Sequence, residues 1–315
     1  MRPTKSIVPL LILLTTPLAA PLAAPLEAQV EIERRRPAPA RGEVSIENAF
    51  GSIVVRAWDR NEVEVRGTLA AGAEGLDFDG DQEGVSIDVS VPDSWFHAAG
   101  EDAAFRTVLE IDVPVGASVS VDSVNASIDV AGVAGEVNVS TVNGAVKIAG
   151  PTKGVEVETM TGAVEVRASA APMRIHTISG KVDLAGVAGD VSVESVSGPV
   201  EVAGSGVSQL EIESTTGSVL FRGSLAQAGR VQIETFSSPV RLVLPRTAKA
   251  ELDLTSFSGK IESDFCAGTP VTRERFEPFR QLRCSTGAEG FEIEVRTHDA
   301  DITVAAEGGE EGAKP

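Results

Sequence analysis

The residues best suited to acid–base or metal chemistry are three histidines, and they are widely separated in the sequence. His97, His176 and His298 show neither the spacing of a zinc site nor the partners of a serine-histidine-aspartate triad. His176 lies 18 residues after Glu158 and 18 residues before Glu194. A cation in such a row relieves the repulsion of a carboxylate ladder, so the role expected of His176 is structural.

Paired carboxylates are the second candidate for chemistry, because glycosidases use two of them as acid and base or nucleophile. Glu156 with Glu158, and Glu211 with Glu213, have the spacing that places both side chains on one face of a strand. Parallel β-solenoids include polysaccharide-cleaving enzymes, some with calcium held by acidic residues. Here the same pair recurs along most of the chain, whereas a catalytic site is a local exception to a pattern. There is also no Gly-x-Ser-x-Gly elbow, so no catalytic residue is predicted.

Metal and cofactor sites are not indicated either. The acidic run at residues 77–83 resembles a calcium loop but lacks the glycine position and terminal glutamate of the helix-loop-helix motif. A tight Asp-Gly turn between two strands explains it better. Cys266 and Cys284 would need further ligands to hold a metal, and the nearest histidine in sequence is His298. We therefore predict no metal and no cofactor.

The two cysteines enclose the sole cluster of basic and aromatic residues in the chain. In an exported protein Cys266 and Cys284 can form a disulfide, which stabilises by about 3 kcal/mol in the loop-entropy model. The cluster between them is a candidate interaction patch for an acidic partner, although arginine on a loop is usually only exposed to solvent. Its members are Arg273, Arg275, Phe276, Phe279, Arg280 and Arg283.

These residues belong to a chain dominated by a repeat. The phrase apolar-x-apolar-x-Thr/Ser-apolar-Asn/Ser/Thr-Gly-x-apolar-x-apolar occurs eight times between Val119 and Ser263. The copies are 18 to 21 residues apart, a period that indicates a stacked array. Aligned on the glycine, they centre on Ala126, Gly144, Gly162, Gly180, Gly198, Gly217, Ser238 and Gly259.

Each position of the repeat has a distinct character. Two apolar positions before the glycine and two after it alternate with polar ones, as at Val155, Val157, Val164 and Val166. This alternation predicts two short strands per repeat, with charged side chains facing water. The threonines and serines before the glycine suit a turn in which hydroxyls bond the backbone and each other along the stack, although a hydroxyl ladder could also be a track for sugar. The glycine is expected to have a positive φ.

The predicted fold is all-β: a single-domain parallel β-solenoid (β-helix) of about 18–21-residue coils, with irregular N-terminal strands and a C-terminal loop insertion. An antiparallel sandwich is the rival, but it does not require the same residue type at the same place in each copy. Gly51 marks an early coil with the same phrase. Strands at residues 61–67, 85–91 and 107–113 are expected to close that end.

The chain divides into four segments. Arg2 and Lys5 precede an apolar run, a layout typical of a secretory signal cleaved after Ala28. The run is short and contains prolines, and no later segment is long and apolar enough to cross a bilayer, so we expect an exported protein, periplasmic or at the cell surface, without a transmembrane segment. The segments are a signal peptide at 1–28, a flexible lead at 29–42, a solenoid at 43–304 with an insertion at 264–290, and a disordered acidic tail at 305–315.

Composition narrows the choice of partner. A formal net charge of -19 argues against nucleic acid and against anionic membrane surfaces. Tyrosine is absent and tryptophan occurs only as Trp58 and Trp95. Because sugar-binding sites usually stack on aromatic rings, this composition disfavours a carbohydrate module.

The repeat, the phrase at residues 47–55, and the strand at 109–113 followed by Pro114 resemble a widespread bacterial domain family of unknown function, described as a putative adhesin. The resemblance covers roughly residues 42–304 and implies a β-solenoid of exported or cell-envelope proteins, with no catalytic residues to carry over. We therefore predict a non-enzymatic exported scaffold for adhesion, whose partner is a protein or polysaccharide of the cell envelope. A carbohydrate-active solenoid enzyme or sugar-binding module is the alternative.

Overall fold

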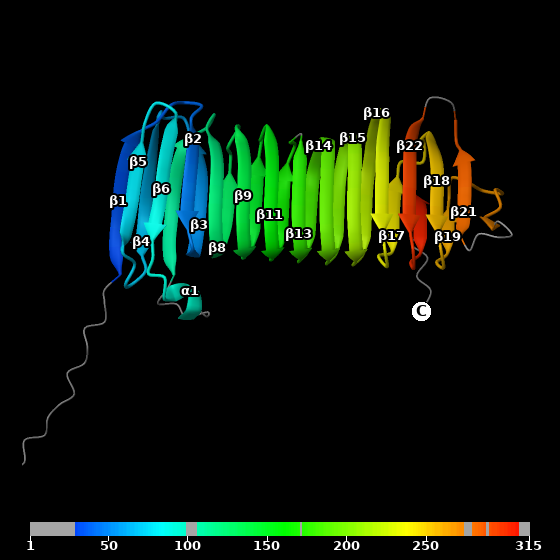
Figure 1. Ribbon diagram of the computed structural model, residues 1–315. Coiled ribbons are helices and arrows are strands. Elements are labelled where there is room, and N and C mark those ends of the chain that lie inside the picture. The colour runs from blue at the N-terminus through cyan, green and yellow to red at the C-terminus, as the bar shows by residue number, and fades with distance from the viewer. Residues whose placement is uncertain (1–28, 99–105, 171, 274–278, 288–289, 309–315) are drawn as a thin grey trace, which may run out of the picture.

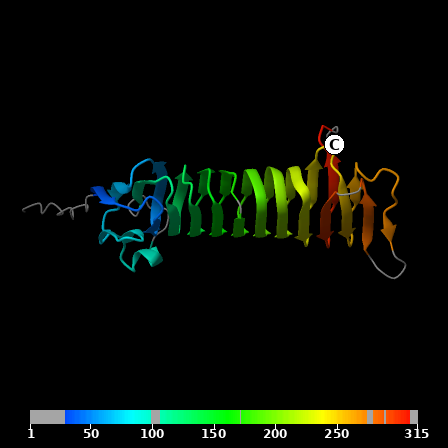
Figure 2. The same ribbon diagram turned by 90° about the horizontal axis from the view of Figure 1, so that it is seen from above.

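The protein is an elongated rod of short strands that cross its long axis (Figures 1 and 2). The computed structural model describes residues 29–98, 106–170, 172–273, 279–287 and 290–308. Almost all of the regular structure in these residues is β-strand. The one helix among them, α1 (Trp95–Ala98), has four residues and is too short to span a bilayer.

The strands form one sheet wound into two long ladders. The first ladder contains the strands that precede the turn of each repeat. In spatial order it consists of β5 (Gly75–Gly80), β6 (Gly84–Ser90), β2 (Glu43–Asn48), the first half of β8 (Ser118–Ala131), β9 (Glu136–Asn143), β11 (Gly154–Thr161), β13 (Met173–Ser179), the second halves of β14 (Val182–Ser197), β15 (Val200–Thr216) and β16 (Val219–Thr235), β22 (Phe291–Thr297), β18 (Ala250–Ser256), β21 (Arg280–Ser285) and β20 (Thr272–Arg273).

The second ladder contains the strands that follow the turn. In spatial order it consists of β1 (Val30–Pro37), β4 (Glu62–Leu69), β7 (Thr107–Pro114), β3 (Phe50–Trp58), the second half of β8, β10 (Val146–Gly150), β12 (Val164–Ala168), the first halves of β14, β15 and β16, β17 (Val240–Leu244), β23 (Ile302–Ala306) and β19 (Ile261–Ser263).

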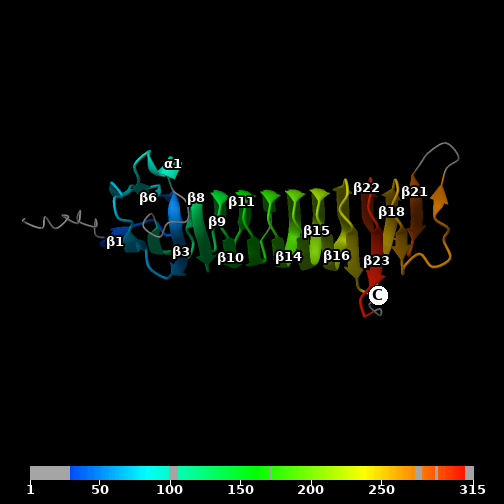
Figure 3. The same cartoon turned by 90° about the horizontal axis from the view of Figure 1, so that it is seen from below.

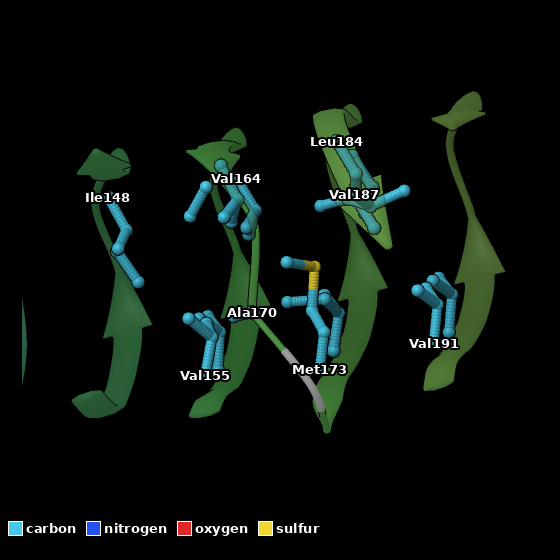
Figure 4. Packing of buried hydrophobic residues seen from close by; sticks show 14 of the residues in the cluster. Ile148, Val155, Val164, Ala170, Met173, Leu184, Val187 and Val191 are labelled. Carbon is cyan, nitrogen blue, oxygen red and sulfur yellow. The ribbon is translucent and has the colours of Figure 1, made fainter. Parts of the chain in front are cut away.

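Equivalent residues of successive coils lie opposite each other in parallel pairs. Val146 pairs with Val164, and Val164 pairs with Val182. The apolar side chains point into the space between the ladders, where Val155 and Met173 lie below Val164 (Figure 4). All of them are buried, so the predicted inward positions are confirmed. The fold is all-β and β-solenoid-like.

The glycine of the repeat is required by space as well as by φ. Gly162 has a φ of +140°, and a Cβ atom there would lie 2.1 Å from the carbonyl oxygen of Gly144 in the previous coil. Gly259 lacks the positive φ that the repeat predicts. A Cβ atom at Gly259 would nevertheless lie 1.8 Å from the carbonyl oxygen of Ala300. Close stacking of backbone on backbone is therefore the constraint that these two glycines share.

The turn hydroxyls bond within the fold, as the sequence predicts. Thr159 Oγ1 donates to the carbonyl of Thr161 at 3.3 Å, and Thr161 Oγ1 donates to the carbonyl of Val142 in the previous coil at 3.4 Å. Ser214 and Ser238 share a hydroxyl–hydroxyl bond of 3.0 Å. These bonds give the hydroxyls a structural role that needs no ligand.

Spatial order departs from sequence order at the C-terminal end of the rod. β22 lies between β16 and β18, and β23 lies between β17 and β19, so the last coil in sequence is inserted into the stack (Figure 1). Ion pairs hold it against its neighbour, with Arg230 Nη2 2.7 Å from Glu292 Oε2 and Arg296 Nη1 3.6 Å from Glu234 Oε1. Stacking in simple sequence order, which the repeat predicts, is wrong here.

The N-terminal end has the same arrangement. β2 lies between β6 and β8, and β3 lies between β7 and β8, so the first coil in sequence is also covered by a later one. The expected early coil at Gly51 is confirmed, because Gly51 pairs with Ala126. The three strands predicted to close this end form β4, β6 and β7.

Two expected boundaries need correction. The lead at residues 29–42 is not a flexible segment, because Val30–Pro37 forms β1 antiparallel to β4. The buried carboxylate of Glu64 on β4 accounts for this, since Arg35 Nη2 of β1 lies 2.7 Å from it. The tail expected from residue 305 begins later, because β23 continues to Ala306. Residues 1–28 and 309–315 lie outside the described part of the chain.

The insertion at residues 264–290 closes the C-terminal end of the rod. Its β21 pairs antiparallel with β18, and the short β20 pairs with β21 beyond it. Figure 3 shows this hairpin as the outermost element at that end. Cys266 and Cys284 lie at disulfide-bonding distance, with Cα atoms 5.9 Å apart.

Replacing both cysteines by serine is expected to lower the free energy of unfolding by about 3 kcal/mol, because the pair is separated by 18 residues and constrains the unfolded chain. Urea unfolding of the purified protein, with and without reductant, measures the effect. The double variant is the control for the reductant itself. Because it has no disulfide, reductant should leave its urea midpoint unchanged and lower only that of the wild type. A wild-type midpoint that reductant leaves unchanged would contradict the expectation.

Candidate binding groove

An open groove of about 840 Å³ runs along the first ladder across seven successive coils. We call it the axial groove. Six of these coils contribute three consecutive residues each, the first contributes only Ser123, and stacking turns them into three rows. The acidic row contains Ser140, Glu158, His176, Glu194, Glu213 and Glu234; the hydroxyl floor contains Ser123, Thr141, Thr159, Thr177, Ser195, Ser214 and Thr235; the apolar ridge contains Val142, Met160, Ile178, Val196, Thr215 and Phe236.

The rows follow from strand geometry. Successive side chains of a strand point to opposite faces, so Glu158 faces outward and Thr159 faces inward. Met160 then faces outward again at the turn, just before the glycine. Because equivalent residues stack about 4.8 Å apart, each wall of the groove is a row of equivalent positions along the rod.

The apolar ridge is unusually exposed. Val142, Met160, Ile178, Val196 and Phe236 are between 44% and 56% exposed. Scattered exposed apolar side chains are ordinary on a protein surface, but a contiguous strip of them marks a site of interaction. Here the strip runs through four successive coils from Val142 to Val196, and Thr215 separates it from Phe236. Nothing in the turn itself requires an apolar residue at this position.

Some carboxylates of the acidic row form ion pairs and others do not. His176 Nδ1 lies 3.2 Å from Glu194 Oε2, which confirms the expected place of His176 within a carboxylate ladder. Glu234 is paired with Arg296 of the inserted coil. Among the described residues, neither Glu158 nor Glu213 forms an ion pair.

Several charges on the second ladder pair with one another. Arg167 Nη1 lies 2.6 Å from Asp183 Oδ1, and this hydrogen bond is the main reason why the pKa of Asp183 is lowered. Lys181 Nζ lies 3.1 Å from Glu201 Oε2, and its hydrogen bond to Glu201 raises the pKa of Lys181. Arg167 with Asp183 and Lys181 with Glu201 thus pair on the second ladder, whereas Glu158 and Glu213 beside the apolar ridge do not form ion pairs within the described residues.

At the N-terminal end, the chain itself covers the position that corresponds to the ridge. Ala49 and Val124 stand two residues before Gly51 and Ala126, and they pack against a cluster that includes Trp95 of α1. Figure 1 shows α1 at the edge of the rod where the arrowheads of β9, β11 and β13 end. The side chain of Phe96 lines a smaller hollow of about 460 Å³ over the same coils.

At the C-terminal end, the ridge continues as a stack of rings. The imidazole of His298 lies between the rings of Phe236 and Phe257, with centroid distances of 4.8 Å and 4.7 Å and nearly parallel planes. Phe279 meets Phe257 edge to face at 5.6 Å. His298 belongs to the inserted coil, so its position depends on the order of strands at this end.

The patch predicted between the cysteines is only partly described. Arg275 and Phe276 lie outside the described residues, and Arg273 is placed by backbone pairing with Arg280. Arg280 Nη1 donates to the carbonyl of Gly259 at 2.8 Å. Arg283 Nε lies 3.0 Å from Asp253 Oδ2, and Phe279 joins the ring stack. The described arginine side chains thus have partners within the fold, and the patch stays a prediction.

The other sequence candidates occupy ordinary positions. Glu156 and Glu211 project from the first ladder outside the axial groove, while their partners Glu158 and Glu213 line it. In the acidic run at residues 77–83, residues 77–80 belong to β5 and residues 81–83 form the expected turn to β6.

Backbone hydrogen bonds fix this turn. Asp81 Oδ1 accepts from the amides of Glu83 and Gly84, at 2.8 Å and 3.1 Å. These bonds, led by the one from Glu83, lower the pKa of Asp81.

Sequence reasoning missed the ridge as a functional feature. The signal was present in the repeat phrase, where an apolar residue stands between two hydroxyl positions and breaks the alternation of the strand. An apolar residue that recurs at an outward position in most copies has no use in the core. That mismatch marks the position as unusual, and the exposure of its residues in the structure shows that it is a surface feature.

Comparison with known proteins gives a family and two distant structures. The sequence model of the Toastrack family (DUF4097) matches residues 42–305. A crystal structure described as a putative adhesin from Bacteroides fragilis is 10% identical, covers 89% of this chain and 98% of its own, and has a TM-score of 0.44. One described as a putative cell adhesion protein from Clostridium sporogenes is 11% identical, covers 88% and 100%, and has a TM-score of 0.26. No curated protein matches the chain.

Proposed function

This chain belongs to the Toastrack family, and on that premise we propose that it is a non-enzymatic, exported scaffold that binds a protein or a polysaccharide of the cell envelope. The observation that carries the proposal is the apolar ridge, a strip of half-exposed side chains along an otherwise charged rod. Solenoids commonly use extended surfaces of this kind for binding. Binding of this kind would serve the adhesion role that the sequence predicts.

The uniformity of the axial groove supports binding without catalysis. A catalytic centre needs a nucleophile, a base and an orienting group in one local arrangement. The groove instead repeats similar side chains in most coils, with Ser140, His176 and Thr215 as the exceptions. Several of its turn hydroxyls form structural hydrogen bonds, such as that of Thr159 to Thr161, although those of Ser123 and Ser195 have no hydrogen-bond partner among the described residues.

Export is supported by the cysteine pair. Disulfides persist in oxidising compartments, and Cys266 and Cys284 lie at bonding distance. The signal sequence predicted at residues 1–28 is consistent with the same destination. A periplasmic or cell-surface location follows as part of the proposal.

The test uses purified full-length protein in two assays. Sedimentation with isolated bacterial envelope fractions is expected to show saturable binding. Incubation with a panel of acidic and neutral polysaccharides is expected to release no new reducing ends. The proposal fails if no envelope fraction binds, or if reproducible cleavage is lost in Glu213→Gln but not in Glu165→Gln on the second ladder.

A further inference from the structure

We infer that the axial groove receives an amphipathic, cationic α-helix of a partner protein, laid lengthwise along the rod. The inference rests on the proposed function and names the class of partner. It is carried by the charge of the acidic row, the spacing of the coils and the way the chain covers its own ridge.

The negative charge of the groove favours a positively charged ligand. Glu158 and Glu213 have no ion-pair partner among the described residues, and the whole chain has a formal net charge of -19. A ligand that contacts the ridge with apolar side chains brings its flanks beside these carboxylates. Lysine or arginine on those flanks complements them, whereas acidic flanks are repelled.

Spacing selects a helix over a strand. The coils repeat about every 4.8 Å along the groove, while one turn of an α-helix advances about 5.4 Å. Side chains on one face of an extended strand are about 6.6 Å apart, a poorer match to the ridge. A helix therefore places one apolar side chain near each ridge residue over several turns.

The backbone excludes strand addition within the groove. Thr159 of the floor already pairs with Thr141 on one side and Thr177 on the other. A bound chain cannot extend the sheet there, so its affinity must come from side chains. Recognition by the side chains of one amphipathic face is how helices bind grooves.

Length is also consistent with a helix. The groove spans seven coils, and six steps of about 4.8 Å give about 29 Å. A helix of about 20 residues has that length. Such a segment is common at the surface of proteins.

The chain provides its own example of this contact. Trp95 of the short helix α1 belongs to the apolar cluster that covers Ala49 and Val124. Phe96 of α1 lies 5.6 Å from the ring of Phe50. Those two covered positions are the continuation of the ridge, which is bare only from Val142 onward.

The experiment uses a synthetic, fluorescently labelled peptide of about 20 residues, with leucine at i, i+3, i+4 and i+7 and lysine elsewhere. Fluorescence anisotropy is expected to show binding to the full-length protein, and circular dichroism a gain of peptide helicity. Ile178→Asp is expected to weaken binding at least about tenfold, because it places a charge in the middle of the ridge. Val115→Asp is the matched control, since Val115 is 49% exposed but lies outside the groove, and it should bind as the wild type does.

A second pair of variants tests the acidic row. Glu213→Gln is expected to weaken peptide binding about threefold at low salt, with the difference shrinking at high salt. Glu165→Gln, on the second ladder, should leave binding unchanged. None of the four variants changes a buried position, and equal melting temperatures verify that the fold is retained.

Four outcomes overturn the inference, the last of which leaves the proposed function standing. The first is equal binding of a scrambled peptide of the same composition, and the second is equal binding by Ile178→Asp and Val115→Asp. The third is a polysaccharide that occupies the groove and loses affinity in Ile178→Asp while the peptide does not bind. If envelope binding persists without peptide binding, the helix is wrong and the proposed function stands.

Discussion

Val164→Asp is expected to lower the free energy of unfolding by more than about 4 kcal/mol, or to prevent folding. Val164 is 1% exposed and lies between Val146 and Val182 in the second ladder. A carboxylate there loses its water without gaining a partner. Chemical unfolding followed by far-ultraviolet circular dichroism measures the loss.

Glu165→Ala is the control for this substitution. Glu165 is the next residue along β12 but points to solvent, where Arg167 lies 3.4 Å away. Exposed ion pairs contribute about 1 kcal/mol or less, so the variant should be nearly as stable as the wild type. Comparable losses in the two variants would mean that the inward and outward faces are wrongly assigned.

Gly162→Ala is expected to lower the free energy of unfolding by about 3 kcal/mol or more. The new Cβ would overlap the carbonyl oxygen of Gly144 at 2.1 Å, and the φ of +140° is unfavourable for alanine. Because neighbouring coils share this backbone contact, relief requires the coils to move apart. Thermal unfolding of the purified variant measures the change.

Gly154→Ala, in the same coil, isolates the cause. Gly154 has no positive φ, and the nearest atom to its Cβ would be the carbonyl oxygen of Pro172 at 3.5 Å, an ordinary contact. We expect a change of about 1 kcal/mol or less. If Gly154→Ala is as damaging as Gly162→Ala, the close backbone contact with Gly144 is not the cause of the loss.

The repeat predicted the coils well because each of its positions has one physical requirement, such as burial or exposure to water. Val164 must be apolar to fill the interior, and Glu165 must be polar to face water. Stacking then places equivalent residues of successive coils opposite each other. Residues that align between copies of the repeat are therefore the residues that pair between strands. The turn hydroxyls were predictable for the same reason, since an exposed turn needs local hydrogen bonds.

The order of coils at the two ends could not be read from the repeat. Every coil has the same inward columns, so the pattern shows that residues 291–304 form a coil but not where it inserts. The preference arises from outward side chains. Arg296 meets Glu234, and His298 fits between two phenylalanine rings. The early strand β1 was missed because its arginines suggested a flexible segment, whereas Arg35 pairs with the buried carboxylate of Glu64.

The residues of the candidate site were visible in the repeat, but their role in binding was not predicted from the sequence. The sequence directed attention to the arginines between Cys266 and Cys284, yet Arg280 and Arg283 are bound to the fold. The ridge became visible only when the exposure of Ile178 and its equivalents was known. A residue pattern can show that a position is apolar, but only the path of the turn shows that it stays outside.

The most direct test of the scaffold account is the binding of full-length protein to isolated bacterial envelopes, compared between Ile178→Asp and Val115→Asp. The account predicts saturable binding that Val115→Asp retains and Ile178→Asp loses, with no polysaccharide cleaved in either case. Equal binding by the two variants, or release of reducing ends by the wild type, would contradict it.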